Sequence, residues 1–171
     1  MKISNYNPSN DPEFQDFIKE LEKESDRGIA IICHAYVEDL LKELLKRRLI
    51  ENKNFIKRLE KSISFNQLLK LCFITGVVTE EEKRDILLLN EIRNKFAHKR
   101  KVNNFNQAEI CDLCKELRIP KFSGKKSTRN KYISTAAYYV QILNLKLRYI
   151  KKIRRIEAES RNPKMLDNLF I

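Results

Sequence analysis

The residues most able to do chemistry lie close together near the end of a predicted helix. Arg93, Asn94 and His98 follow an apolar helical pattern, with four residues between the arginine and the histidine. Histidine can take up or release a proton near neutral pH, and arginine presents a forked donor that suits phosphoryl oxygens. Asparagine can orient either partner. This spacing predicts a site directed at a phosphate group.

A purely structural role for the same residues is also open. Arg93 could pair with Glu91 or Asp26, and His98 could close the C-terminus of its helix. Isolated residues are weak indicators, but the adjoining amide and the three cations that follow His98 favour a functional site.

Positive charge is segregated along the chain. Lys and Arg number 35 against 23 Asp and Glu, which gives a net charge of +12. Segments 93–101, 118–131 and 146–155 hold 5, 6 and 6 of these cations and no acid. Clustered cations suit a polyanionic partner, although solvated helix faces would also explain them. The predicted nucleic-acid contacts are Lys95, Lys99, Arg100, Lys101, Lys121, Lys125, Lys126, Arg129 and Lys131.

Composition favours a single all-α domain of about five to seven helices. Only three Gly and four Pro interrupt 171 residues that are 42% apolar. We expect a loosely ordered N-terminus over 1–10, a helical domain over 11–160 and a C-terminal tail over 161–171. No apolar run approaches the roughly 18 residues of a membrane span, so we expect a soluble, cytoplasmic protein.

Apolar spacing and capping residues predict the helices. The first expected helix begins at Asp11-Pro12, and the second follows Ser25-Asp26-Arg27-Gly28 and ends at Lys46-Arg47-Arg48. Four more are expected, over 65–74, from Thr79 to His98, over 107–118 and over about 128–160. A further short helix is possible over 54–60. Ser64 is a plausible cap, Gly76 a stop, and Thr79 with Glu82 a capping box.

At about 100° per residue, the helix that carries the motif has two unlike faces. Leu88, Leu89, Ile92 and Phe96 form the core face, and Leu87, Glu91, Asn94 and His98 line the opposite one. Leu87 is an odd residue to leave in water. We therefore expect this face to meet a second copy of the chain, with Arg93, Asn94 and His98 near the two-fold axis.

Two family resemblances follow. Arg93-Asn94-Lys95-Phe96-Ala97-His98 resembles the Arg-x(4–6)-His signature of the HEPN superfamily of helical domains. Residues 12–118 resemble the mannitol operon repressor (MltR) family through Glu24-Ser25-Asp26-Arg27-Gly28, Asp39-Leu40-Leu41-Lys42-Glu43-Leu44-Leu45, Thr75-Gly76-Val77-Val78, Glu91-Ile92-Arg93-Asn94 with Phe96-Ala97-His98, and Asp112-Leu113-Cys114-Lys115-Glu116-Leu117. The segment beyond about 150 and the strong positive charge depart from that family.

The resemblances imply different functions. An active HEPN protein is a metal-independent endoribonuclease of the toxin or defence type, which needs no cofactor. His98 would be general acid or base on the RNA, Arg93 would stabilise charge on phosphorus, and Asn94 would position substrate or His98. The MltR family implies instead a non-catalytic regulator that acts through a partner protein or nucleic acid. Either could have a cognate regulator protein.

Other motifs point to packing. Segment 65–97 superficially resembles a helix-turn-helix, but three glutamates would open its recognition helix and repel DNA. Cys111 and Cys114 lack the further ligands that a zinc site requires and are expected in the core. His34 is expected as a satisfied interior or interface residue, and Tyr149 could either stack on bases or pack against helices.

Overall fold

The protein folds as a bundle of α-helices. The computed structural model describes residues 12–49, 61–99, 101–118 and 127–153. Within these ranges it has six helices and no strand: α1 (Pro12–Glu22), α2 (Asp26–Arg48), α4 (Phe65–Ile74), α5 (Glu80–His98), α6 (Ala108–Glu116) and α7 (Thr128–Tyr149). The all-α prediction is confirmed. The possible helix over 54–60 lies outside the described residues, as do 1–10 and 161–171.

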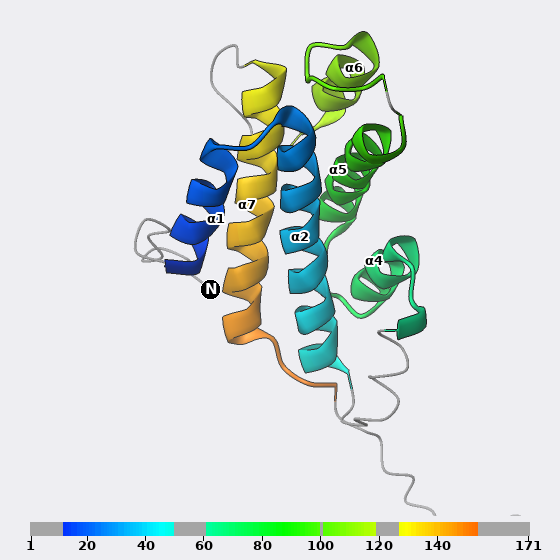
Figure 1. Cartoon of the computed structure of the whole chain (residues 1–171). Coiled ribbons are helices and arrows are strands. Elements are labelled where there is room, and N and C mark those ends of the chain that lie inside the picture. Colours follow the sequence, from blue (N-terminus) through cyan, green and yellow to red (C-terminus); the bar gives the residue numbers. More distant parts are fainter. Residues whose placement is uncertain (1–11, 50–60, 100, 119–126, 154–171) are drawn as a thin grey trace, which may run out of the picture.

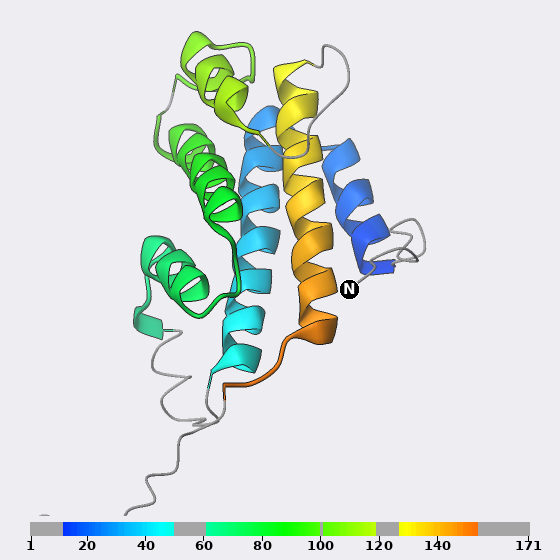
Figure 2. The ribbon, with the colours of Figure 1, turned by 180° about the vertical axis from the view of Figure 1, so that it is seen from behind.

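Two long helices form the centre of the bundle. α2 and α7 lie side by side and run in the same direction, so both end at the same end of the molecule (Figure 1). α1 flanks this pair on one side, and α4, α5 and α6 flank it on the other, as the reverse view in Figure 2 also shows. The C-terminus of α5, which carries the motif, therefore lies near α6 and the beginnings of α2 and α7.

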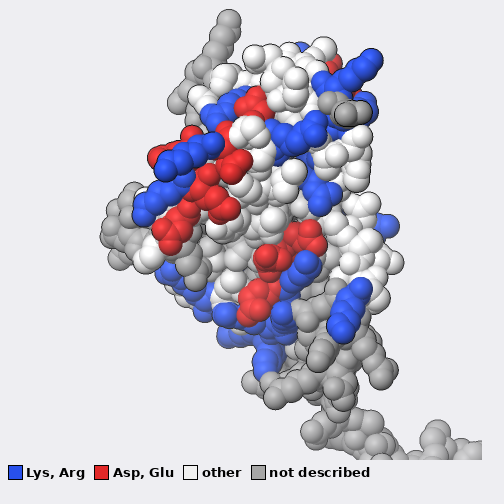
Figure 3. Space-filling model, viewed as in Figure 1, with Lys and Arg blue, Asp and Glu red and all other residues white. Residues whose placement is uncertain are grey.

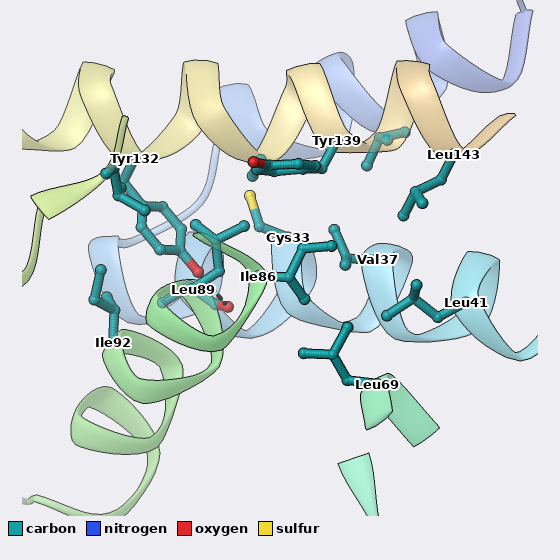
Figure 4. Packing of buried hydrophobic residues seen from close by; sticks show 14 of the residues in the cluster. Cys33, Val37, Leu41, Leu69, Ile86, Leu89, Ile92, Tyr132, Tyr139 and Leu143 are labelled. Carbon is teal, nitrogen blue, oxygen red and sulfur yellow. Dashed lines mark hydrogen bonds between the residues drawn. The ribbon is translucent and has the colours of Figure 1, made fainter. Parts of the chain in front are cut away.

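The core forms where α2, α5 and α7 meet. Apolar side chains from α2, α4, α5 and α7 point toward one another in Figure 4, among them Cys33, Val37, Leu41, Leu69, Ile86, Leu89, Ile92 and Leu143. The rings of Phe96, Phe105 and Tyr132 then link the end of α5 to α7, with centroids 4.9 and 5.1 Å apart. This apolar contact fixes the segment that carries the motif.

One ionisable group is sealed inside this core. The Asp85 carboxylate is fully buried and accepts hydrogen bonds from the Tyr139 hydroxyl (3.3 Å), the Arg118 backbone N–H (3.1 Å) and the Arg84 guanidinium. A buried carboxylate is tolerated when it is paired in this way. Asp85 thus fastens α5 to α7 and to the end of α6.

The predicted caps are present. Ser64 with Gln67 and Thr79 with Glu82 each form a complete capping box. Gly76 has a φ of 70°, a left-handed conformation that glycine adopts at little cost, and it follows the end of α4. These local signals determine where α4 ends and α5 begins.

Two predicted boundaries were wrong. Ser25 is the N-cap of α2, so Asp26, Arg27 and Gly28 form its first turn instead of a break before it. The last helix ends at Tyr149 instead of near residue 160, because Ile150 adopts an extended conformation. The following backbone packs on α2: the Ile153 N–H donates to the Arg48 carbonyl at 2.9 Å. No helix in the described ranges is both long and apolar enough to cross a membrane.

Candidate functional site

The motif occupies the last two turns of α5. The Arg93 guanidinium donates from Nη1 to the Asn94 side-chain oxygen at 2.8 Å. Its Nε is buried and has no hydrogen-bond partner within the part of the chain that the structure describes. His98 is the final residue of α5, and its side chain is exposed. Arg93 and Asn94 are thus brought together, whereas His98 lies one turn further along at the surface.

The exposure of α5 agrees with the predicted division into two faces. Leu89, Ile92 and Phe96 are buried, and Leu88 packs against them from the margin. On the other face Leu87 is 39% exposed, and Glu91 and His98 are also exposed, while Asn94 is half-buried. That a second copy of the chain covers this row stays a prediction.

Arg93 faces the interior more than the surface. It lies close enough to His34 of α2 that its positive charge, together with the larger effect of burial, lowers the pKa of the imidazole. The Glu38 carboxylate, 3.6 Å from His34 Nδ1, acts in the opposite direction but more weakly. His34 is only 3% exposed, and its ring packs on Phe65 with centroids 4.4 Å apart.

This environment differs from the predicted one for His34. The interior position is confirmed. Among the described residues Nε2 has no hydrogen-bond partner of good geometry, although the Asn90 side chain lies near enough to raise the pKa of the imidazole. A neutral imidazole tolerates such a site better than a charged one. The proximity of Arg93 to His34 was not predicted, because the two are 59 positions apart in the chain and no local pattern links them.

Glu109 engages two of the predicted phosphate contacts. Lys95 and Lys99 both approach its Oε2, at 3.1 and 2.6 Å. Hydrogen bonds from Lys99 and then Lys95 lower the pKa of this carboxyl. Although segment 93–101 contains no acid, the fold places Glu109, from the first turn of α6, beside Lys95 and Lys99.

Arg129 and Lys131 are also engaged within the chain. Arg129 pairs with Asp26 at 3.0 Å, and Lys131 donates to the Lys115 carbonyl at 3.0 Å. The suggestion that Asp26 could pair with Arg93 was therefore wrong. Lys101 is exposed. Arg100, Lys121, Lys125 and Lys126 lie outside the described residues.

The first turn of α2 supports the backbone that follows α5. Asp26 accepts a hydrogen bond from the Phe105 N–H at 2.9 Å. Arg27 donates to the Val102 carbonyl at 2.8 Å and more weakly to the Lys99 carbonyl at 3.4 Å. The Asp26-Arg27 pair, which carried part of the family resemblance, therefore has a structural role here.

The cysteines behave as the sequence predicted. Cys114 is buried, and burial raises the pKa of its thiol to about 12. The half-buried Cys111 thiol donates to the Phe105 carbonyl at 3.3 Å. The Cys114 thiol therefore stays protonated at neutral pH, and both side chains contribute to the packing of α6.

Fold and site together define an all-helical bundle with an arginine-asparagine pair and a surface histidine at the end of α5. The sequence matches no protein-family model and no curated protein. Among solved structures, the chain is similar to one in the X-ray structure of the MtlR-HPr complex from Escherichia coli, with a TM-score of 0.60 and 14% sequence identity. The similarity covers 77% of this chain and 98% of that one.

At this level of identity the similarity establishes the fold. It agrees with the resemblance to the mannitol operon repressor family, whose motifs lie in α2, in the turn after α4, in α5 and in α6. The HEPN resemblance rests on the six-residue signature alone.

Proposed function

We propose that this chain is a non-catalytic regulatory protein that acts by binding a partner protein. The observation that carries the proposal is the similarity to nearly the whole length of a chain from the MtlR-HPr complex, in which that protein is bound to another protein. The site adds support, because Lys95 and Lys99 share an ion pair with Glu109 and Arg129 pairs with Asp26. They are less available to RNA than their sequence positions indicate.

The outward row of α5 is the surface that we propose for the partner. Leu87 is 39% exposed and shares this face with Glu91, Asn94 and His98. An apolar side chain surrounded by polar groups is typical of a protein–protein contact, in which the apolar part is buried and the rim stays hydrated. Such a surface can bind another protein without any bond being broken.

Calorimetric titration of the full chain with HPr from the source organism tests this proposal. We expect specific binding that Leu87→Glu weakens by at least about tenfold, since a buried charge at an interface centre is costly. Ile74→Glu is the matched control, because Ile74 is 77% exposed at the end of α4. Absence of binding to HPr, or equal binding by the two variants, would contradict the proposed partner or the proposed surface.

The same variants test the predicted homodimer. If the outward row of α5 forms the two-fold interface, Leu87→Glu converts a dimer to a monomer in light scattering, and Ile74→Glu does not. A wild-type protein that remains monomeric at high concentration would disprove self-association.

A second candidate function is metal-independent endoribonuclease activity, which the HEPN resemblance implies. The hydrogen bond between Arg93 and Asn94, with an exposed His98 one turn on, favours it. Arg93 would stabilise charge on phosphorus and His98 would transfer the proton. Incubation of diverse RNAs with EDTA should then give cleavage that His98→Ala abolishes and Lys115→Ala preserves. An inert wild-type protein would end this candidate.

A further inference from the structure

The other end of the bundle carries a second concentration of positive charge. Because α2 and α7 run in the same direction, their C-termini meet at one end (Figure 1). We call this region the basic end and define it by seven residues: Lys46, Arg47, Arg48, Lys146, Arg148, Lys151 and Lys152. Lys and Arg atoms gather over the lower end of the molecule in Figure 3.

Acids of the described residues form ion pairs with two of the cations at the basic end. Glu43 pairs with Arg47 at 3.0 Å, and Glu82 pairs with Lys146 at 2.5 Å. Of the two further glutamates that begin α5, Glu80 pairs with Lys83, which leaves Glu81. Each of the two helix C-termini contributes about half a negative charge. Among the described residues, these acids leave Arg48 and Lys151 without an ion pair.

Arg48 keeps its charge although its guanidinium is held in place. It donates from Nε to the Thr75 carbonyl at 3.0 Å and from Nη1 to the Lys151 carbonyl at 2.8 Å. Carbonyl oxygens are neutral acceptors, so these bonds orient the guanidinium without forming an ion pair. The side chain of Lys151 is exposed and forms no ion pair within the described residues.

A pocket of about 510 Å³ opens among these residues. Its lining comprises Arg48, Gly76, Val77, Val78, Thr79, Lys146, Tyr149, Ile150 and Lys151. The volume falls within the range of roughly 300–1,000 Å³ that is typical of ligand sites. Tyr149 is 57% exposed at the edge of the pocket, so an aromatic face lies beside three cations.

We propose that the basic end binds single-stranded nucleic acid, with an unpaired base stacked on Tyr149 and phosphates on Arg48 and Lys151. Cations spread over the ends of two helices suit a chain of phosphates better than one small anion. An exposed aromatic beside them suits a base that is not already stacked in a duplex. This surface is separate from the outward row of α5, so the two proposals can fail independently.

Fluorescence anisotropy with a labelled oligouridine of about 20 nucleotides tests the proposal. This length exceeds the roughly 4–16 nucleotides that one binding module covers. We expect Tyr149→Ala to weaken binding about tenfold and Tyr149→Phe, which keeps the ring, to bind as the wild type does. Lys151→Ala should weaken binding and lower the slope of log affinity against log salt by about 0.7, the value for one single-strand phosphate contact.

Lys115→Ala is the matched control, since Lys115 is 75% exposed on α6 at the other end of the bundle. It should change neither the affinity nor the salt slope. Thermal melting of each variant checks that the fold is intact, and Leu87→Glu should leave oligouridine binding unchanged.

Four results would overturn the proposal. The first is equal loss of affinity in Lys115→Ala and Lys151→Ala, and the second is no loss in Tyr149→Ala. The third is binding of a blunt RNA duplex as tight as that of oligouridine, because a duplex offers no unpaired base. The fourth is equally tight binding of a polyglutamate peptide, which would indicate an acidic protein as the ligand.

Discussion

The two ends of the bundle are both rich in Lys and Arg, yet they differ in how these cations are held. At the α5 end, Glu109 engages Lys95 and Lys99, and Asp26 engages Arg129. At the basic end, Arg48 is held by neutral carbonyls, and Lys151 has no ion pair among the described residues. An acid-free segment of sequence therefore says little about the charge that a partner would meet.

The path of the backbone explains this difference. After α5 the chain turns back, so the first turn of α6 places Glu109 beside the last turn of α5. After α7 the chain packs against Arg48 through backbone groups alone. The first arrangement brings an acid to Lys95 and Lys99, whereas at the basic end Glu82 pairs with Lys146 and the described residues bring no acid to Arg48 or Lys151.

The largest effect that would sharpen this contrast is expected for Asp26→Ala. The substitution leaves Arg129 unpaired and the Phe105 N–H without its acceptor. We expect a loss of about 2 kcal/mol in the free energy of unfolding, measured in urea, because Arg129 is partly exposed and its share is screened. Oligouridine binding at the basic end should be unaffected.

Asp16→Ala is the control for that measurement. Its carboxylate is 75% exposed and pairs with Lys19 of the same helix at 3.4 Å. Its removal should cost less than about 0.5 kcal/mol. If the two substitutions cost the same, the Asp26 contacts do not stabilise the α5 end.

A smaller effect is expected for Glu109→Gln, which would make the two ends more alike. The neutral amide releases the charges of Lys95 and Lys99, so the α5 end should gain a salt-sensitive affinity for oligouridine of its own, while binding at the basic end stays unchanged. Glu116→Gln makes the same change on the same helix without disturbing a described ion pair. Should both variants gain equally, net charge alone would account for the increase.

The smallest effect concerns the pH dependence of stability, which tests whether Arg93 acts inward. Burial and then the charge of Arg93 lower the pKa of folded His34 below its ordinary 6.5. As the pH falls, His34 therefore takes up a proton in the unfolded chain at a higher pH than in the folded chain. The free energy of unfolding is highest above pH 6.5 and declines as the pH falls from 6.5 through the lower pKa of the folded chain.

Urea unfolding from about pH 8 down to about pH 5 should show this decline in the wild type and less of it in His34→Gln. Arg93→Gln should also reduce it, since the charge that lowers the pKa is gone. The chain has only two histidines, and His98 is exposed. An unchanged profile in His34→Gln would show that His34 is not the group responsible.

Features that depend on near neighbours in the sequence were predictable. Thr79 and Glu82 are three positions apart, and their side chains need only each other's backbone to begin α5. Gly76 ends α4 for an equally local reason. The outward position of Leu87 and His98 follows from the period of the helix alone.

Features that depend on distant partners were not predictable in this way. The end of α7 at Tyr149 reflects contacts with Arg48, 103 positions before Lys151. The neutralisation of Lys95 requires Glu109, which becomes a neighbour only when α6 folds back. Lys46-Arg47-Arg48 and segment 146–155 were both visible as cationic, but only the parallel course of α2 and α7 brings the described part of that segment, 146–153, to the end of α2.

The first turn of α2 also bears on the order in which the molecule can assemble. Asp26 can pair with Arg129 only after 103 further residues have been synthesised, and Arg27 can reach the Val102 carbonyl only after 75. Closing such long loops costs entropy before any contact repays it, so these bonds form late. A chain still on the ribosome with α2 to α6 complete would have these helices, but Asp26 would still lack its partner Arg129.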